Sequence, residues 1–199
     1  WLLKKSLCCV DQFVCVSEAT ATVAREKGID ASQLTVIPPG VWDEKSLVTR
    51  LPAVALAKAG HSSLVILTVG RLVKRKGVAW FIEHVLPELA QRHPKLQYWV
   101  IGEGPERRRI EEIVLEKKLE LCVKMLGLLD DETRDQCYAR ATLFLMPNID
   151  VENDMEGFGI ACIEASSRGI PVIAAALEGL QDSVVDGLTG KHFESGNAP

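Results

Sequence analysis

Two carboxylates near the end of the chain, Glu156 and Glu164, are separated by seven residues that include a glycine-rich turn. Glu156 opens this turn, Gly157-Phe158-Gly159, and Glu164 lies within the helix that the next residues predict. Because the glycines carry no side chain, backbone N–H groups at the helix start can approach an anion closely. The helix dipole suits a phosphate, and the carboxylates can accept hydrogen bonds from hydroxyl groups on either side of it. The pattern therefore indicates a ligand whose hydroxyl groups flank a diphosphate, as in a nucleotide sugar.

A structural explanation of the same residues competes with this one. Acidic residues are common at helix starts because they complement the dipole, so an isolated Glu-Gly-Phe-Gly is more often structural than functional. The spacing to Glu164, together with a second group of residues upstream, favours a binding site.

The upstream group is a basic loop at residues 70–77, which follows a continuous apolar run. Arg71 comes directly after that run and its glycine. Arg71 and Lys76 are suited to a diphosphate, the guanidinium as a fork and the ammonium as a point charge. Lys74 and Arg75 are interpreted differently, as part of a solvated surface run.

From residue 64 onward, short apolar runs alternate with amphipathic or charged segments. The runs predict strands at residues 64–69, 96–101, 123–126, 143–146 and 171–174. Helices are predicted at residues 78–92, 106–118 and 130–139, after Glu156, and near Gln181. Pro87 is expected to kink the first helix, and Pro105 to occupy the first position of the second. This alternation indicates an α/β fold, a doubly wound, Rossmann-like parallel sheet covered on both faces.

Every loop singled out above follows a predicted strand. Ligands of open α/β sheets bind outside the carboxyl ends of the strands, so these loops should converge on one crevice. The long loop at residues 147–155 belongs to the same edge, and we expect it to influence the choice of sugar.

The first part of the chain predicts a smaller strand–helix–strand unit. Residues 11–17 form a short apolar strand that ends at Ser17, a good helix N-cap. The helix at residues 18–27 is stopped by Gly28, and a second strand at residues 34–37 is halted by a Pro-Pro-Gly turn.

Composition excludes several classes of protein. The chain has 199 residues, is 47% hydrophobic and 25% charged, and is therefore globular rather than disordered. A net charge of -4 argues against a general nucleic-acid binder. No apolar stretch approaches the roughly 20 residues of a membrane helix, and no signal peptide is visible. The six cysteines include no Cys-x-x-Cys pair, which favours buried thiols in a reducing compartment over a disulfide or zinc site.

Three motifs in order carry a specific resemblance. They are Val69-Gly70-Arg71-Leu72 with Lys76-Gly77, then Ile101-Gly102-Glu103-Gly104-Pro105, and then Glu156-Gly157-Phe158-Gly159 with Glu164-Ala165. Their order and spacing resemble the C-terminal, donor-binding domain of retaining glycosyltransferases with two Rossmann-like domains (the GT-B fold, group 1 or family 4 type). Residues 17–20 and 36–41 resemble the stretch leading into that domain, although Pro39 stands where the family often has asparagine. The resemblance covers nearly the whole chain.

The resemblance implies a division of the chain. Residues 1–45 would lead in from an N-terminal acceptor domain that this chain lacks. Residues 46–199 would form the nucleotide-sugar donor-binding domain, truncated at its C-terminus. The first residue is Trp1 rather than methionine, and the last stretch holds no terminating element, which also indicates a piece of a longer protein.

The resemblance also implies a role for each matching residue. Arg71 and Lys76 would hold the donor diphosphate and neutralise the leaving group, and Glu156 would complete the catalytic set by meeting the sugar hydroxyls. Glu164 would accept the ribose hydroxyls. The other donor-binding residues would be Gly102 beside the nucleotide, Leu129 and Asp131 near the base, and Gly70, Gly157, Phe158, Gly159 and Ile160 around the sugar and diphosphate.

The implied activity transfers a sugar from a UDP-, GDP- or ADP-sugar to an acceptor with retention of configuration. It requires no cofactor and no metal. The implied acceptor is a glycan, a lipid or a small molecule, bound through the N-terminal domain, and no nucleic acid is a partner. The parent is expected in the cytoplasm, with peripheral association at the inner face of a membrane as an option. The isolated chain is expected to be inactive.

Three other functions fit parts of the pattern. A nucleotide-sugar epimerase would build the same crevice but requires an acid and a base from another domain. A nucleotide-binding module would bind the nucleotide and catalyse nothing. A nicotinamide dehydrogenase is disfavoured because no strand is followed by Gly-x-Gly-x-x-Gly; Gly102-Glu103-Gly104 lacks the third glycine. The pairs Arg71/Lys76 and Glu156/Glu164 favour the transferase.

Overall fold

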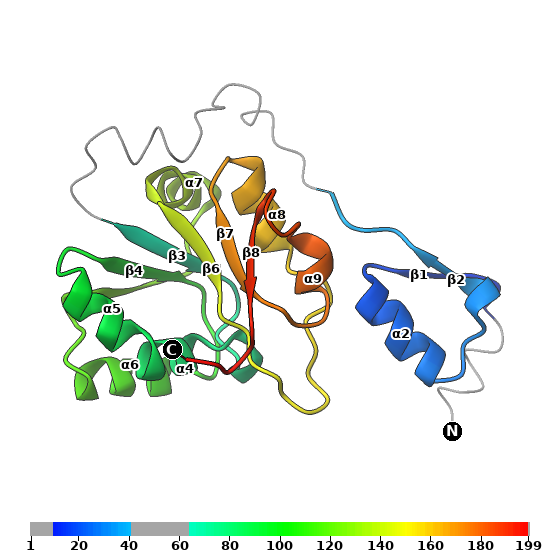
Figure 1. The fold of residues 1–199 in the computed structure, drawn as a ribbon, viewed down its shortest axis with the longest axis horizontal. Coiled ribbons are helices and arrows are strands. Elements are labelled where there is room, and N and C mark those ends of the chain that lie inside the picture. Colours follow the sequence, from blue (N-terminus) through cyan, green and yellow to red (C-terminus); the bar gives the residue numbers. More distant parts are fainter. Residues whose placement is uncertain (1–9, 41–63, 199) are drawn as a thin grey trace.

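A computed structural model describes residues 10–40 and 64–198 of the chain (Figure 1). The domain boundary expected at residues 45 and 46 lies outside the described residues, as do Cys8 and Cys9. The other four cysteines, Cys15, Cys122, Cys137 and Cys162, are buried free thiols, as the sequence predicts.

Six parallel strands form the main sheet, in the order β5-β4-β3-β6-β7-β8. They are β3 (Val65–Val69), β4 (Gln97–Ile101), β5 (Val123–Gly127), β6 (Leu143–Met146), β7 (Val172–Ala175) and β8 (Gly190–Phe193). Central strand β3 is apolar and almost wholly buried because both of its faces are covered.

Helices cover both faces of this sheet (Figure 1). Ile66 of β3 packs into a core with α4 (Val78–His84), α5 (Leu86–Arg92) and α6 (Arg107–Glu116). The next residue, Leu67, points to the other face and packs with α7 (Asp131–Arg140), α8 (Ile160–Ser167) and α9 (Leu180–Ser183). The doubly wound, Rossmann-like α/β fold is therefore confirmed.

Three local details differ from the sequence prediction. The helix expected at residues 78–92 is two helices that meet at Val85, two residues before Pro87, which lies in the first turn of α5. Proline has no N–H to continue a helix but fits a first turn. Pro105 lies in the turn before α6, whose N-cap is Glu106. Strand β8 was not expected, since its sequence, Gly-Lys-His-Phe, is not an apolar run.

The winding of the sheet reverses between β3 and β6. From β3 the chain builds outward through β4 and β5, then returns to β6 beside β3 and continues to β7 and β8. Ligands of doubly wound sheets bind where the strand order reverses. The loops after β3 and β6, residues 70–77 and 147–155, therefore start at neighbouring positions on the ligand edge.

The leading unit consists of parallel strands β1 (Phe13–Cys15) and β2 (Leu34–Val36), with α2 (Glu18–Glu26) and the 3₁₀ turn η1 (Ala31–Gln33) between them. Ser17 caps α2 in a capping box with Thr20, as the sequence predicts. The backbone N–H of Glu18 donates to Asp182 Oδ2 of α9 at 2.8 Å, which joins the leading unit to the larger one. Figure 1 shows α2 and β1 on the side of the larger unit that carries α9.

Candidate active site

A buried charged cluster lies where the loops after β3 and β6 meet. Its centre is Glu156 Oε2, which lies 2.5 Å from Lys76 Nζ, 3.1 Å from Asn148 Nδ2 and 3.8 Å from Arg75 Nε. All four residues are at most 9% exposed. A carboxylate and two cations are thus held together away from bulk water, at the edge where the fold predicts a ligand.

Local backbone structure places each member of this cluster. The 3₁₀ turn η2 (Lys74–Lys76) follows β3 and buries Arg75 and Lys76. Asn148 is the second residue after β6. The N–H of Glu156 donates to the Glu178 carboxylate, and its C=O accepts from the N–H of Gly179 at 3.2 Å.

The charge of Glu156 follows from its neighbours. Burial alone raises the pKa of this carboxyl, but the Lys76 ammonium lowers it by attraction and by a hydrogen bond. The amide of Asn148 and the guanidinium of Arg75 lower it further, so the pKa of Glu156 lies below its ordinary value. Glu156 is therefore ionised at neutral pH. Burial raises the pKa of Glu178, and the negative charges of Asp150 and Glu156 add to this rise.

The turn after Glu156 leads into α8 as the sequence predicts. Gly159 is the N-cap of α8 with φ 81°, in the left-handed region, and a Cβ there would lie 2.5 Å from Leu180 Cδ2. Only glycine fits both conditions. Phe158 is buried, so its ring packs inside the protein. Gly157 is half-buried and Ile160 is exposed at the helix start.

Glu164 lies one turn into α8. Its Oε2 accepts a hydrogen bond from Tyr138 Oη at 2.9 Å. The Arg168 guanidinium stacks over the Tyr138 ring at 4.7 Å from its centre. Burial, with the nearby Glu164 charge, raises the pKa of Tyr138, so the phenol stays protonated and acts as the donor. The half-buried Glu164 carboxylate is thus held by α7 at one oxygen.

The basic loop after β3 contributes groups of two kinds. Arg71 is exposed and forms no ion pair with any residue in the two described ranges. Lys76 is buried against Glu156, and its Cε lies 3.5 Å from the place where a Cβ on Gly70 would stand. Gly102 is needed for a close approach, because a Cβ there would lie 1.9 Å from the carbonyl oxygen of Gly70. The structure therefore packs the first two motifs against each other.

Leu129 and Asp131 follow β5, two strands away from β3. Leu129 is half-buried and packs against the core of α7 and α8. Asp131 is the first residue of α7, is exposed, and pairs with Arg134 at 3.0 Å. Both share the ligand edge of the sheet with Glu156, although neither contacts the charged cluster in the described contacts.

One sequence interpretation is wrong. Lys74 is exposed, as expected for a solvated run, but Arg75 is only 9% exposed and pairs with Asp154 at 3.2 Å. Sequence reasoning also missed Asn148 and Glu178 as neighbours of Glu156. Asn148 is a polar residue two positions after a strand, which is a signal for its role. Nothing local distinguishes Glu178.

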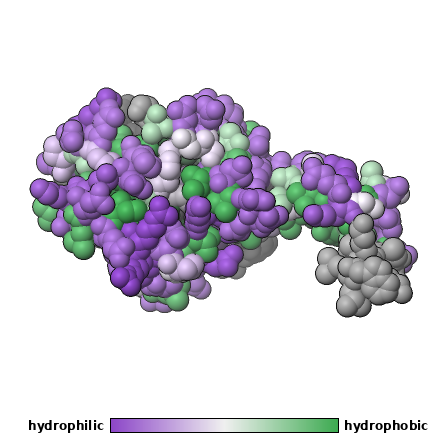
Figure 2. Space-filling view, turned by 90° about the horizontal axis from the view of Figure 1, so that it is seen from below, coloured by the Kyte–Doolittle hydropathy of each residue, from purple (hydrophilic) through white to green (hydrophobic). Residues whose placement is uncertain are grey.

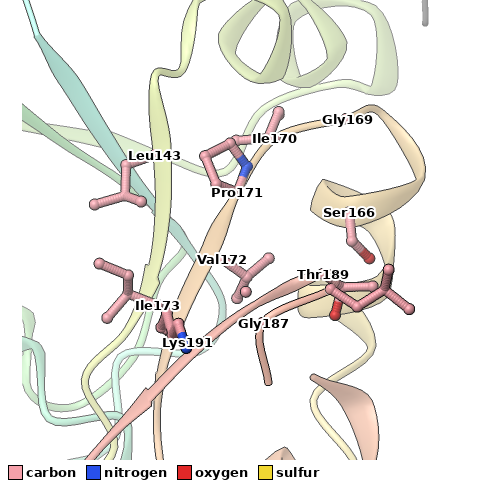
Figure 3. Close-up of a pocket in the computed structure, with 12 residues that line it drawn as sticks. Leu143, Ser166, Gly169, Ile170, Pro171, Val172, Ile173, Gly187, Thr189 and Lys191 are labelled. Atoms are coloured by element: carbon pink, nitrogen blue, oxygen red, sulfur yellow. The ribbon is translucent and has the colours of Figure 1, made fainter. Parts of the chain in front are cut away.

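A cavity of about 500 Å³ lies at the opposite edge of the sheet (Figure 3). Leu143, Val172 and Gly190, the first residues of β6, β7 and β8, line it. It is therefore separate from the charged cluster, which follows the carboxyl ends of strands. Strand β6 runs down in Figure 1 into the loop 147–155, and the molecule seen from that side is largely hydrophilic with scattered apolar patches (Figure 2).

Comparison with known proteins identifies the family. Residues 57–199 match the family described as glycosyl transferases group 1. The chain belongs to this family. The order of the three sequence motifs thus led to the correct family, and the chain corresponds to the C-terminal half of a GT-B glycosyltransferase.

Individual relatives agree with this assignment to glycosyl transferases group 1. The chain is 30% identical over 189 residues to a subunit of human phosphatidylinositol N-acetylglucosaminyltransferase, covering 94% of the chain and 36% of the relative. It is 29% identical over 172 residues to the amylovoran biosynthesis glycosyltransferase AmsK of Erwinia amylovora, covering 86% of the chain and 40% of the relative. The chain thus spans less than half the length of these curated relatives.

Solved structures show the same fold. Sucrose-phosphate synthase from Thermosynechococcus elongatus superposes with a TM-score of 0.72 at 29% identity, over 92% of this chain and 45% of that one. Anabaena HepE, in complex with UDP, superposes with a TM-score of 0.73 at 23% identity, over 94% of this chain and 51% of that one. In the described parts of this group 1 chain, no helix is long and apolar enough to cross a membrane.

Proposed function

We propose that the parent protein transfers a sugar from a nucleoside-diphosphate donor to an acceptor with retention of configuration. This chain supplies the donor-binding half. The observation that carries the proposal is the buried Lys76–Glu156 pair, held at 2.5 Å where the sheet reverses its winding in a group 1 glycosyltransferase. It offers a cation for a phosphate and a carboxylate for a sugar hydroxyl at one point.

The diphosphate is assigned to the space between the basic loop and α8. Arg71 is exposed and unpaired within the described residues, so its guanidinium is available for a bidentate contact. The N–H groups of Gly157, Phe158, Gly159 and Ile160 lead into the positive end of α8. Lys76 shares its charge between Glu156 and the departing phosphate.

The sugar and the nucleoside are assigned to the two carboxylates. Glu156 is ionised and accepts hydrogen bonds from sugar hydroxyls. Glu164 accepts the ribose hydroxyls, with Tyr138 holding its other side. Gly70 and Gly102 allow the nucleotide to lie close to the backbone, while Leu129 and Asp131 border the base.

Catalysis in this proposal is mainly electrostatic. Lys76, Arg71 and the helix dipole stabilise the charge that develops on the leaving nucleoside diphosphate, without rearrangement during the reaction. The acceptor hydroxyl attacks from the face that the leaving group departs from, and the diphosphate takes its proton. Cations of the chain serve the diphosphate, so no metal is required.

The acceptor is assigned to the remaining part of the parent, because the chain spans only part of its relatives. Residues 1–45 belong to the segment that leads in from that acceptor domain, and residues 46–199 to the donor domain. The name of the human relative points to N-acetylglucosamine as the first sugar to test and to a phosphatidylinositol lipid as the first acceptor. A glycan or small-molecule acceptor is tested next. The parent is placed in the cytoplasm, with a lipid acceptor reached at the inner face of a membrane.

The first experiment titrates the chain with UDP, GDP and ADP by calorimetry, with and without magnesium. We expect one diphosphate to bind saturably whether or not magnesium is present. Arg71→Ala and Glu164→Ala should each weaken binding by about 10-fold or more, since hydrogen bonds to charged groups contribute about 1.5–3 kcal/mol. Arg108→Ala is the matched control, because Arg108 is an exposed arginine of α6 paired with Glu112.

The result is interpreted together with the full-length parent. The isolated chain is expected to transfer no sugar, and the parent to transfer it with retention. If neither protein binds any of the three diphosphates, the proposed function is wrong. If both substitutions leave the affinity unchanged, the assignment of residues is wrong even though the function stands.

A further inference from the structure

Arg75 touches three separate points of the polypeptide beside the charged cluster. Its Nη1 lies 3.2 Å from Asp154 Oδ1, and its Nε lies 3.8 Å from Glu156 Oε2. Its backbone C=O accepts from the N–H of Ile149 at 2.9 Å. One residue of η2 thus contacts the loop 147–155 near both of its ends and also contacts the carboxylate that follows the loop.

Burial and opposite charge strengthen the contacts of Arg75 with Asp154 and Glu156. Glu156 is 7% exposed, and Arg75 and Lys76 are both 9% exposed, so their attractions are weakly screened. Arg75 pairs with the carboxylates of Asp154 and Glu156. Glu156 and Asp150 also act on the carboxyl group of Glu178 by charge repulsion. Without Arg75, Lys76 would be the only buried cation of the cluster, and the carboxylates of Asp154 and Glu156 would lose their common partner.

Two buried polar atoms of the cluster have no hydrogen-bond partner among the described residues. They are Arg75 Nε, a donor, and Asn148 Oδ1, an acceptor. Both belong to side chains that contact Glu156 Oε2, at 3.8 Å through Arg75 Nε and at 3.1 Å through Asn148 Nδ2. An unsatisfied buried polar group costs free energy, and neither atom is stabilised by a hydrogen bond within the cluster.

We propose that Arg75 is a positioning residue that determines which sugar the site accepts. It does so by tying the loop 147–155 to Glu156, the carboxylate assigned to the sugar. The inference rests on the proposed function. The diphosphate and the ribose are assigned to Arg71, Lys76, the start of α8 and Glu164, so Arg75 acts on binding of the sugar and not on binding of the nucleotide.

The test compares the affinity for a nucleotide sugar with that for the nucleotide alone. The full-length parent is titrated with UDP, UDP-N-acetylglucosamine, UDP-glucose, GDP and GDP-mannose. In the unsubstituted protein, the preferred sugar nucleotide should bind more tightly than its diphosphate. Arg75→Met should lower the affinity for the sugar nucleotide by about 10-fold, while the affinity for the matching diphosphate should change by no more than about 2-fold. Arg75→Lys should restore part of the loss, because an ammonium can neutralise one carboxylate but cannot bridge two.

A second variant tests the contact between Arg75 and the loop 147–155. Asp154→Asn removes the ion pair at a side chain that is 46% exposed, and should preserve folding. Asp154→Asn should lower the affinity for the sugar nucleotide about 3-fold. The double variant with Arg75→Met should bind the sugar nucleotide no more weakly than Arg75→Met alone. In these variants, the ratio of kcat/KM for the preferred donor to kcat/KM for the second-best donor should fall together with the affinity for the preferred sugar nucleotide. Arg108→Met, on the exposed face of α6, is the matched control for loss of an arginine.

The outcomes separate this inference from the proposed function. Absence of any diphosphate binding in the unsubstituted parent overturns the proposed function and this inference with it. If Arg75→Met loses affinity equally for the sugar nucleotide and the diphosphate, only this inference is overturned, because Arg75 then has a general structural role. Additive losses in the double variant also overturn it. If Arg75→Met does not fold, as judged by its thermal transition, Arg75→Lys and Asp154→Asn decide by the same ratio.

Discussion

Lys76 Nζ lies 2.5 Å from Glu156 Oε2, although the two residues come from loops that follow different strands, β3 and β6. Both residues are buried, at most 9% exposed. The pair exists because the order of the strands places the carboxyl ends of β3 and β6 side by side. A preorganised pair of this kind offers opposite charges to a ligand without a large change of structure.

Removal of one partner of this pair should cost more than removal of both. Lys76→Met leaves Glu156 buried with the Asn148 amide and, as its only cation in the cluster, the more distant guanidinium of Arg75, and should lower the free energy of unfolding by about 3 kcal/mol. The double variant Lys76→Met/Glu156→Gln should recover more than half of this loss, because no uncompensated buried carboxylate remains. Urea unfolding of Lys76→Met, Glu156→Gln and the double variant measures the coupling between the two side chains. Additive losses would show that the two side chains do not stabilise each other.

Replacement of Glu178 should stabilise the protein at neutral pH. Burial and nearby negative charge raise its pKa in the folded state above the ordinary value of 4.5. The folded state therefore binds this proton more tightly than the unfolded state, so ionisation of Glu178 costs stability as pH rises through and above these values. Glu178→Gln should gain a few tenths of a kcal/mol at pH 7, a modest amount because solvent screens the group, and nothing at pH 3.

The comparison with Glu156 gives the opposite sign. The pKa of Glu156 is lowered on folding, so its ionised form contributes stability above pH 4.5 that is lost as pH falls through the folded pKa. Glu156→Gln should therefore be less stable than the unsubstituted chain at pH 7, and this difference in stability should become smaller at acidic pH. Thermal melting between pH 3 and pH 8 checks both variants. The raised pKa of Glu178 is contradicted if the stability of Glu178→Gln, measured relative to the unsubstituted chain, is lower at pH 7 than at pH 3.

Gly159 should tolerate no side chain. Its φ of 81° is unfavourable for any other residue, and a Cβ would lie 2.5 Å from Leu180 Cδ2. Gly159→Ala should destabilise the chain by about 2 kcal/mol, through strain and overpacking together. Gly157→Ala is the matched control, because the nearest atom to its Cβ is Val16 Cγ2 at 3.7 Å. Chemical denaturation measures both, and equal effects would refute the role of Gly159.

The contact between Asp182 and Glu18 should govern how firmly α2 is attached. Asp182→Ala removes the acceptor of the Glu18 N–H and should raise the hydrogen-exchange rate of that amide about 5-fold, equivalent to roughly 1 kcal/mol. Asp182→Asn keeps an oxygen acceptor and should have a smaller effect. An unchanged rate in Asp182→Ala would mean that this amide is protected by other interactions.

Much of the fold was predictable because its signals are local. The runs that became β6 and β7 are continuously apolar, and β3 departs from this only at Thr68, as expected for strands buried on both faces. Ser17 and Asp130 were recognisable as helix starts because their side chains accept from nearby backbone N–H groups. Strand β8 was not predictable, since Gly-Lys-His-Phe becomes a strand only by pairing with β7.

The sequence by itself determined the motif order, and with it the family and the convergence of the basic and acidic loops at the ends of the strands. Only the tertiary structure decided which of three successive cations, Lys74, Arg75 and Lys76, turn inward. Their side chains have similar local preferences, so the choice depends on partners supplied by a distant loop, Asp154 and Glu156. Burial of a charge is favourable only where such a partner is present, and that condition is met by the strand order rather than by neighbouring residues.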